Sequence, residues 1–459
     1  MAETKSTVTI ESTLTALVEG KKYATLRDIL ITMNPSDVAA VFEDMDEGVL
    51  PLLFRLLPKE LAAETFVEME PESQELLIHG FSDAELQEVV DELYVDDAVD
   101  LVEEMPTNVV KRILRSADPE MRRMINEILR YPEDSAGSIM TTEFATLRPK
   151  MTVEEAIKRI RRTGVDKETI NTCYVTDRGE LIGALSLRTL ILSDPDDVVE
   201  DIMEPHVISV STTEDQETVA QMFSKYNFSA MPVVDTENRL VGIVTVDDAI
   251  DVMQEEVTED IEKMAAITPS EKTYLRSNAV DLFKHRIPWL MLLMVSATFT
   301  GMILNKFEDA LAVQVVLTIF IPMLMDTGGN SGSQASVTVI RALALDELEF
   351  PDLLQVIWKE IQTAVLCGAA LAVACFAKIM LVDRLLLGNT DVTMLVAAVV
   401  CLTMAMTVLV AKIVGCTLPM FAKKLGFDPA VVASPFITTI VDALSLLVYF
   451  GIAMALLKI

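Results

Sequence analysis

The sequence has few of the side chains that bind soft metals or form disulfides. Five cysteines occur among 459 residues and none forms a CxxC pair, and only three histidines are present, without an HExxH pattern. Cysteines in apolar segments act as small buried hydrophobes, which disfavours disulfides and structural zinc. A zinc hydrolase is disfavoured as well. A bound metal would therefore have oxygen ligands, which suit hard ions such as Mg²⁺ or Ca²⁺.

Positive charge is scarce in the first three-fifths of the chain. Residues 1–275 carry 57 Asp and Glu against 25 Lys and Arg, a net charge of −32, whereas residues 276–459 carry 13 against 12. A charge of −32 repels itself in the folded state unless cations screen or bridge it. A cation is therefore the first candidate for both ligand and cargo.

Long apolar runs occur only in the nearly neutral part. Residues 287–305 are uncharged over 19 positions, enough to cross a bilayer at about 1.5 Å per residue. Further runs begin near residue 311 and lie at about 361–377, 392–411 and 429–457. Five spans place the chain ends on opposite sides of the membrane. No signal peptide is expected at the start, and the loop charges favour a cytoplasmic N-terminus, with the C-terminus outside a plasma or inner membrane.

Asp442 is the one charge within the fifth run. A carboxylate at membrane depth is costly and normally faces a bundle interior or water. Thr438 and Ser434 lie four and eight residues earlier, on the same helical face. A structural Asp paired with a neighbouring helix is the alternative, but no intramembrane Lys or Arg is an obvious partner. We therefore predict an ion pathway at Asp442.

The polar stretch 326–334, DTGGNSGSQ, interrupts the second run. Two adjacent glycines weaken a helix and expose carbonyl groups, which membrane proteins tolerate where backbone lines a cavity. A small-residue packing face is the alternative. Together with Asp442, the stretch supports the predicted pathway.

Residues 136–255 contain an internal repeat. LIGALSLRTLI at 181–191 matches LVGIVTVDDAI at 240–250, and Ile-Met opens each copy. Each copy is predicted to form a strand, a helix, two strands joined by a turn and a second helix. The repeat resembles a tandem pair of CBS domains, a regulatory module.

Many CBS pairs bind adenine nucleotides through a G-x-x-[ST]-x-x-D pattern, and this resemblance implies where ATP would bind. The second copy has the whole pattern, whereas in the first copy Thr189 replaces the Asp; the matching residues are Gly242, Thr245 and Asp248, and Gly183 and Ser186. At most one complete nucleotide site is implied. A purely structural pair is the alternative.

Residues 1–130 are predicted to be helical throughout, with amphipathic segments at 35–45, 58–69 and 95–105 that follow acidic openers. Stacked helical pairs in a small superhelix are the expected arrangement. A further helix at 246–266 connects the repeat to the first span, and its acidic residues at spacings of three and four share one face. Like charges at this spacing destabilise a helix. This acidic face has two interpretations: cations bridge it to another acidic surface as part of a switch, or it is simply exposed to solvent.

In this order of parts the chain resembles the MgtE family of magnesium channels over essentially its whole length. The resemblance is carried by GIVTVDDAIDVMQEEVTEDI, HRIPWLMLL, PMLMDTGGNSGSQA and DPAVVASPFITTIVDALSLLVYF. It implies a multidomain membrane protein with an all-α superhelical N-domain (1–132), an α+β pair of CBS repeats (133–200 and 201–253), a plug helix (254–280) and a five-helix transmembrane pore domain (281–459). It also implies a homodimer in the lipid bilayer, Mg²⁺ as cargo and regulator, no enzymatic activity and no nucleic-acid partner.

The resemblance also implies particular site residues. Asp442 matches the pore aspartate, which would hold a largely hydrated Mg²⁺, and the expected pore-lining residues are Ser434, Thr438, Gly329 and Asn330. Cytosolic Mg²⁺ would close the pore by binding between the N-domain, the CBS pair and the plug, through Asp96, Asp97, Asp100, Asp215, Glu217, Asp248, Asp251, Glu256, Glu259 and Asp260. Asn227 stands where the family pattern predicts an acidic ligand.

Two other functions are weighed against an Mg²⁺ channel. One is a CBS-regulated carrier of another divalent cation, such as Co²⁺ or Mn²⁺, or of an anion, which would need basic residues at membrane depth. The other is a membrane enzyme, sensor or scaffold without transport. No nucleophile–base signature supports an enzyme.

Overall fold

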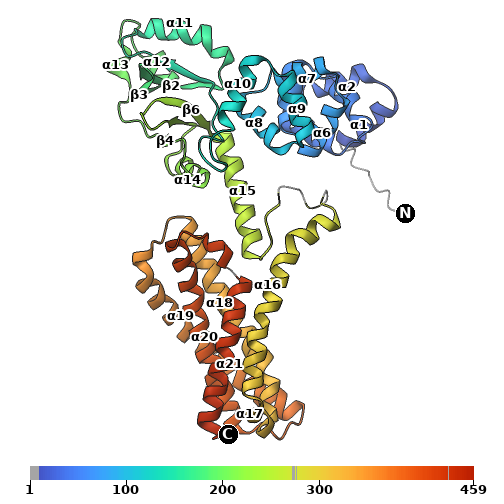
Figure 1. Cartoon of the computed structure of the whole chain (residues 1–459), viewed down its shortest axis with the longest axis vertical. Coiled ribbons are helices and arrows are strands. Elements are labelled where there is room, and N and C mark those ends of the chain that lie inside the picture. Colours follow the sequence, from blue (N-terminus) through green and yellow to red (C-terminus); the bar gives the residue numbers. More distant parts are fainter. Residues whose placement is uncertain (1–9, 271–273, 275–276, 433, 459) are drawn as a thin grey trace, which may run out of the picture. The chain divides into compact units, whose positions relative to one another are not determined.

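The computed structural model describes residues 10–270, 274, 277–432 and 434–458. It consists of two compact units, residues 1–253 and 254–459, and the boundary falls inside one helix, α15 (Val246–Met264). Figure 1 labels the elements of both units.

The first unit begins with a domain made of short helices, as predicted. Proline occupies the start of α3, α6 and α10, where its missing N–H costs nothing. Ser82 and Glu85 form a reciprocal capping box at the start of α7. The helices are α1 (Ile10–Glu19), α2 (Tyr23–Leu30), α3 (Pro35–Glu43), α4 (Leu50–Phe54), α5 (Lys59–Val67), α6 (Pro71–Gly80), α7 (Asp83–Val90), α8 (Val95–Glu104), α9 (Thr107–Ser116) and α10 (Pro119–Ile128).

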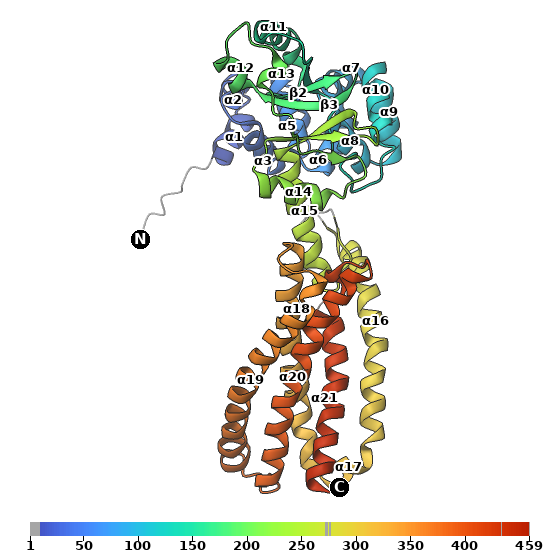
Figure 2. The same ribbon diagram turned by 90° about the vertical axis from the view of Figure 1, so that its left-hand side faces the viewer.

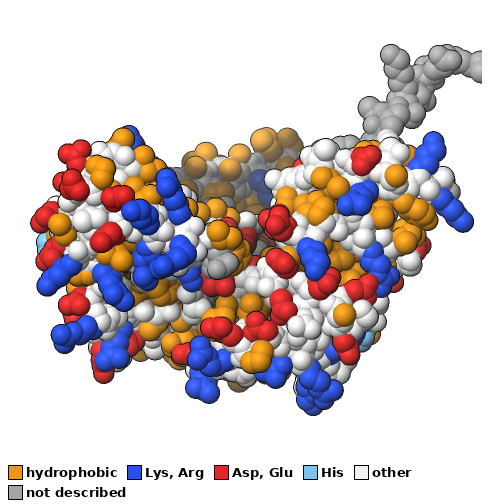
Figure 3. All heavy atoms as spheres, turned by 90° about the horizontal axis from the view of Figure 1, so that it is seen from above, with side chains coloured by type: hydrophobic (Ala, Val, Ile, Leu, Met, Phe, Trp, Pro, Cys, Tyr) orange, Lys and Arg blue, Asp and Glu red, His pale blue; other side chains and the backbone are white. Residues whose placement is uncertain are grey.

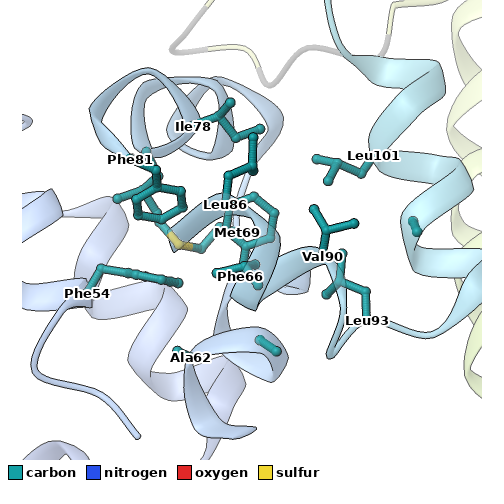
Figure 4. Close-up of a cluster of buried hydrophobic side chains, with 14 of the residues drawn as sticks. Phe54, Ala62, Phe66, Met69, Ile78, Phe81, Leu86, Val90, Leu93 and Leu101 are labelled. Carbon is teal, nitrogen blue, oxygen red and sulfur yellow. The ribbon is translucent and has the colours of Figure 1, made fainter. Parts of the chain in front are cut away.

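One continuous hydrophobic cluster holds these helices together. At its centre the rings of Phe54, Phe66 and Phe81 lie with centroids 5.3–6.4 Å apart. Figure 4 shows these rings together with Leu86 and Val90, both from α7. Because each helix places its apolar face on the same cluster, its acidic residues are left on the opposite faces.

The CBS pair follows, with the predicted order of elements in each repeat. Each three-stranded sheet combines one parallel and one antiparallel pairing, in the orders β1-β2-β3 and β4-β5-β6. The elements are β1 (Phe144–Leu147), α11 (Val153–Thr163), β2 (Thr169–Asp177), β3 (Glu180–Ser186), α12 (Leu187–Leu192), α13 (Val199–Ile202), β4 (Val210–Ser211), α14 (Gln216–Tyr226), β5 (Ala230–Val234) and β6 (Leu240–Thr245).

The opening segment of each repeat packs on the sheet of the other repeat. Thr141 exchanges backbone hydrogen bonds of 2.8 and 2.9 Å with Ile243 of β6. Met140 lies directly over Gly242, and Met203 lies in the same way over Gly183 of β3. A Cβ atom on either glycine would collide with the methionine sulfur. The Ile-Met motifs of the sequence are therefore the residues that join the two repeats.

The second unit is a bundle of long helices. Helices α18, α20 and α21 lie side by side, α19 packs on α20, and α16 packs on α21 (Figure 2). The long helices are α16 (Ala279–Lys306), α18 (Ile321–Ala344), α19 (Leu353–Lys378), α20 (Met394–Lys424) and α21 (Ser434–Leu457). The shorter elements are α17 (Glu308–Val313) and the turns η2 (Val315–Phe320), η3 (Phe350–Asp352), η4 (Ile379–Leu386) and η5 (Pro429–Val432).

Four helical segments of the described chain are long and apolar enough to cross a membrane. They are Ala279–Lys306, Phe350–Leu386, Met394–Lys424 and Pro429–Leu457. The remaining predicted span, the second run, corresponds to α18, whose 24 residues include the polar stretch 326–334. The count of five spans therefore stays a prediction.

The glycines of α18 pack closely and do not break the helix. The helix runs without interruption from Ile321 to Ala344, so the expectation of weakened, exposed backbone at 328–329 is wrong. A Cβ on Gly328 would lie 2.7 Å from the Thr407 side chain and one on Gly329 would meet Thr438. Glycine is needed at these positions because α20 and α21 approach α18 closely, as in other small-residue interfaces of membrane helices.

A buried ion pair lies between α19 and α20. Lys412 Nζ lies 3.3 Å from Glu360 Oε2, and the two side chains are only 7% and 15% exposed. The predicted fourth span ends at residue 411 because Lys412 is charged, but α20 continues for three further turns. The helix tolerates this lysine because Glu360 neutralises it. Lys412 lies just beyond the predicted fourth run, and its pairing with Glu360 leaves no free charge for an anion.

Candidate functional site

The first unit contains a group of acidic side chains where α8 meets the CBS pair. Asp96 is 5% exposed and Asp97 is half-buried, and both carboxylates lie within electrostatic reach of Asp248 at the start of α15. Glu168 is within reach of Asp97, and Glu143 accepts a hydrogen bond of 3.2 Å from the backbone N–H of Val95. We call these five residues the acidic cluster. Seen from above, acidic side chains lie around the hollow in the middle of this unit (Figure 3).

Burial and mutual repulsion raise the pKa values of the cluster. Burial, and then the charges of Asp248 and Asp97, raises the pKa of Asp96 well above its usual range. Burial, and then the charge of Asp248, raises the pKa of Asp97 to about 7. Burial, followed by the charges of Asp97 and Asp247, raises the pKa of Glu168 to about 8. The cluster therefore resists carrying its full negative charge unless a cation is present.

Asp100 and Asp251, which were predicted as regulatory ligands, are solvent-exposed. Asp100 lies within electrostatic reach of Asp248, and Asp251 within reach of Glu68. Among the described residues, no three Asp, Glu, His or Cys side chains are arranged to hold a bare metal ion. An ion at the cluster would thus keep several of its waters, as Mg²⁺ usually does. Two members of the acidic cluster, Glu143 and Glu168, were not predicted, because nothing in the sequence signals that they lie beside α8.

Helix α14 contains Glu217 and is flanked by Asp215 and Asn227, its N-cap and C-cap residues. The Asp215 side chain caps the helix by accepting hydrogen bonds of 3.0 and 3.3 Å from the backbone N–H groups of Glu217 and Thr218. Glu217 in turn accepts a hydrogen bond from Gln221. Asn227 ends the helix with φ 55° and ψ 44°, a left-handed conformation that Asn tolerates better than most residues. Asn at this position therefore has a local structural cause.

Two residues of the sequence pattern proposed for nucleotide binding, Thr245 and Asp248, are hydrogen-bonded to each other. The Thr245 hydroxyl donates a hydrogen bond to the Asp248 carboxylate, which also accepts from the Thr245 backbone N–H at 3.3 Å. In the first repeat, Ser186 and Thr189 make the equivalent contact between two hydroxyls, 2.8 Å apart. Burial raises the pKa of Asp248 to about 6, although the hydrogen bond from Thr245 opposes the shift. Asp248 therefore belongs both to the nucleotide pattern and to the acidic cluster.

The end of α15 is tied to the helical bundle of the second unit. Lys263 Nζ lies 2.7 Å from both Glu259 Oε1 and Asp428 Oδ2, and Met264 packs against Ile340 and Ala430. Burial opposes the charge on Lys263, but hydrogen bonds to Asp428 and Glu259 raise its pKa to about 12. Of the predicted ligands here, Glu259 is thus already paired with a cation. Burial and repulsion from Asp428 raise the pKa of Asp260, and Glu256 lies half-buried one turn earlier.

We predict that Lys263→Gln loosens the end of α15. The change leaves Asp428 and Glu259 without their shared cation, although an ion pair with partly exposed members contributes only about 1 kcal/mol or less. Hydrogen exchange at residues 254–264 should accelerate several-fold in the full-length protein. Lys306→Gln, at an exposed lysine at the end of α16, is the control. Equal exchange rates in the two variants would show that the Lys263 ion pairs do not hold the end of α15 in place.

The predicted pore residues lie on α18 and α21. Asp442 is half-buried and lies within electrostatic reach of Asp326 of α18. Gly329 contacts Thr438, whose hydroxyl donates to the Pro435 carbonyl at 2.9 Å, whereas Asn330 is exposed. Ser434 begins α21, and its side chain lies outside the described part of the chain. Gly329 and Thr438 meet where α18 packs on α21, the helix that carries Asp442, whereas the pore-lining role of Asn330 stays a prediction.

Comparison with known proteins agrees with this layout. Residues 33–134 match the MgtE intracellular N domain, 136–195 and 199–255 match CBS domains, and 321–452 match the MgtE divalent cation transporter model. The magnesium transporter MgtE of Thermus thermophilus is 37% identical over 447 residues, which cover 96% of this chain and 97% of the relative. The chain belongs to the MgtE family. MgtE of Bacillus subtilis is 34% identical over 444 residues.

Two solved structures of magnesium-transporting proteins resemble about half of the chain. The cytosolic domain of the Mg²⁺ channel MgtE in complex with ATP is 38% identical, with a TM-score of 0.51, and covers 53% of this chain and all of that one. The soluble part of a magnesium transporter is 32% identical with a TM-score of 0.50, and covers 54% of this chain and 97% of its own. The prediction of an MgtE magnesium transporter with a helical N-domain and a CBS pair is confirmed at this level. MgtE relatives are named as transporters, in keeping with the prediction of no enzymatic activity.

Proposed function

We propose that this protein is a channel that conducts Mg²⁺ down its electrochemical gradient and closes when cytosolic Mg²⁺ binds its first unit. The observation that carries the proposal is Asp442, a half-buried carboxylate on α21 at the interface with α18. A carboxylate placed inside an apolar bundle attracts a cation and, through water, holds a hydrated one. Two copies of the chain would bring two Asp442 side chains to a shared axis.

Exposed apolar surface supports a bilayer and a second copy as partners. Helix α16 has no buried residue, and large apolar side chains such as Leu290, Val295 and Phe299 are more than half exposed. Such a surface is stable only against lipid or another protein. We propose a cytoplasmic first unit and an extracytoplasmic C-terminus.

The acidic cluster supports closure by Mg²⁺. A cation that binds only the closed arrangement stabilises it by about 2.7 kcal/mol at a hundred times its Kd, and shifting a gate from 1:99 to 99:1 takes about 5.5 kcal/mol. Two or more sites among the predicted regulatory residues would therefore suffice. Because Asp248 belongs to both groups, ATP at the second CBS repeat would alter the same cluster.

Flux into liposomes tests this function. The purified protein should pass Mg²⁺ faster than Ca²⁺, Mn²⁺ or Co²⁺, and raising Mg²⁺ on the side of the first unit should stop the flux. Faster Mn²⁺ or Co²⁺ flux would favour a carrier of another divalent cation. Absence of all ion flux would leave a sensor or scaffold and would refute the proposal.

A further inference from the structure

We propose that the groove between α7 and α9 of the helical domain binds an acidic segment of another protein in an extended conformation. The two helices pack side by side (Figure 1), and between them lies an open groove with a volume of about 950 Å³. Its polar lining includes Gln87, Thr107, Asn108, Lys111, Arg115 and Ser116. None of these residues belongs to the acidic cluster, the nucleotide pattern or the predicted pore, so the proposal is separate from the transport function.

Two basic side chains of the groove have no partner. Lys111 and Arg115 are exposed on α9, and neither forms an ion pair or a side-chain hydrogen bond with another residue of the described chain. The acids of α7 are already neutralised by bases from other parts of the domain, in the pairs Asp83–Arg112, Glu85–Arg55 and Glu88–Lys59. With three bases and one acid in its lining, the groove is positively charged, although residues 1–275 carry a net charge of −32. This charge is complementary to an acidic ligand.

Arg112 holds the two walls of the groove together. Its guanidinium group donates to the Phe81 carbonyl at 2.6 Å, to the Ile78 carbonyl and to the Asp83 carboxylate at 3.1 Å. These contacts tie α9 to the end of α6 and to the start of α7. A ligand therefore meets a preformed groove, which lowers the entropic cost of binding.

The uncharged side chains of the groove favour a peptide over a simple anion. Gln87 of α7 and Asn108 of α9 are exposed, and neither side chain is hydrogen-bonded to another described residue. Each amide offers both donors and an acceptor, which match the N–H and C=O groups of an extended peptide backbone, whereas phosphate mainly accepts. No aromatic or large aliphatic side chain is among the described residues that line the groove. A nucleobase would therefore find no surface on which to stack.

The spacing of the two free cations matches an extended acidic chain. Lys111 and Arg115 are four residues apart on α9, which separates them by about 6 Å along the helix axis. In an extended peptide, side chains at alternate positions lie on the same face and are about 6.6 Å apart. Two acidic residues separated by one other residue can therefore reach both cations at once. The partner segment should contain this alternation.

Peptide binding to the full-length protein in detergent tests the groove. The probe is a fluorescein-labelled peptide of eight residues in which Glu and Ser alternate, and binding is followed by fluorescence anisotropy at low ionic strength. A chelator keeps divalent cations from bridging the probe to the acidic cluster. The wild type should bind with a Kd below about 1 mM. Lys111→Gln/Arg115→Gln should raise the Kd about tenfold, because each exposed ion pair contributes up to about a fivefold effect.

The matched control removes the same two charges elsewhere on the helical domain. Lys22→Gln/Arg27→Gln replaces an exposed lysine and an exposed arginine at α2, and it should bind the probe as tightly as the wild type. No binding by the wild type, or an equal loss in the two double variants, would overturn the groove as the binding site.

Two further measurements distinguish a peptide from a simple anion. Gln87→Ala/Asn108→Ala keeps both free cations and should raise the Kd about fivefold, because hydrogen bonds to the peptide backbone are lost. Inorganic phosphate should displace the probe no better than sodium chloride at the same ionic strength. Unchanged binding in the amide variant, or preferential displacement by phosphate, would overturn the peptide as the ligand.

Discussion

Replacing Asp442 by Asn is expected to reduce Mg²⁺ flux at least about tenfold while the protein still folds. The amide keeps the shape of the carboxyl group but removes the charge that attracts the cation. At an effective dielectric constant of about 20, one carboxylate and a divalent ion about 5 Å apart attract each other by about 7 kcal/mol. Only about 1.4 kcal/mol is needed for a tenfold effect.

The measurement is Mg²⁺ uptake by liposomes that contain equal amounts of correctly folded protein. Folding is checked by size-exclusion chromatography and by thermal unfolding in detergent, where the variant should be at least as stable as the wild type because a repelled charge is lost. Asp391→Asn, in the loop before α20, is the control and should conduct normally. Wild-type uptake through Asp442→Asn would place the pathway elsewhere in the bundle.

Neutralising part of the acidic cluster is expected to make the protein more stable without Mg²⁺ and less responsive to it. The double variant Asp97→Asn/Glu168→Gln removes two charges whose pKa values are raised to about 7 and about 8. Asp248 is left intact because it caps α15 through Thr245, and loss of a cap costs about 1 kcal/mol. The variant should also conduct at internal Mg²⁺ concentrations that close the wild type.

The free energy of unfolding without Mg²⁺ is expected to rise as pH falls. The folded pKa values of these acids lie above the unfolded values of about 4, so the folded state binds more protons between the two. In the presence of a chelator, wild-type stability should therefore rise as pH falls from about 8 towards 5. The loss of stability caused by the charged cluster is complete above about pH 8 and absent below about pH 4. The double variant should show a flatter profile.

Thermal unfolding of the full-length protein between pH 6 and 8.5, with chelator or with Mg²⁺, checks both effects. Asp28→Asn/Glu64→Gln, at two exposed acids of the helical domain, is the matched control. The same Mg²⁺-induced rise in Tm in the wild type and in the Asp97→Asn/Glu168→Gln variant would show that the ion binds elsewhere.

Much of the fold follows from local sequence patterns. The amphipathic segments at 35–45, 58–69 and 95–105 correspond to α3, α5 and α8, and the repeat predicts the strand and helix order of both CBS copies. The predicted boundary between the repeats, at residue 200, lies inside the short helix α13. Where the two copies touch depends on Met140 and Met203 crossing to the opposite sheet, and a single repeat unit contains no signal for that.

The errors in the membrane unit have one physical origin. Gly328 and Gly329 weaken an isolated helix, but tight packing of α20 and α21 compensates, so α18 stays intact. Lys412 ends an apolar run in the sequence, but Glu360, 52 residues earlier, neutralises it. Contacts between helices decide both outcomes. A hydropathy profile contains no information about contacts between residues that are distant in the sequence.

The candidate sites show the same limit. Asp442 is evident because its surroundings in the sequence are apolar. Gly329 and Thr438 lie in separate apolar runs of the sequence, and only the packing of α18 on α21 brings them together. The acidic cluster likewise combines α8 with Glu143 and Glu168, which lie far from it in the sequence.

The crossed packing of Met140 on Gly242 and of Met203 on Gly183 has a consequence for cooperativity. Neither repeat covers its own sheet completely, since the methionine of the other copy lies over the glycine in each sheet. The pair should melt in one transition, without a state in which one copy is folded alone. The two copies should then move together as one rigid body. Helix α15 continues directly from the last strand of the second copy, so it should move with them.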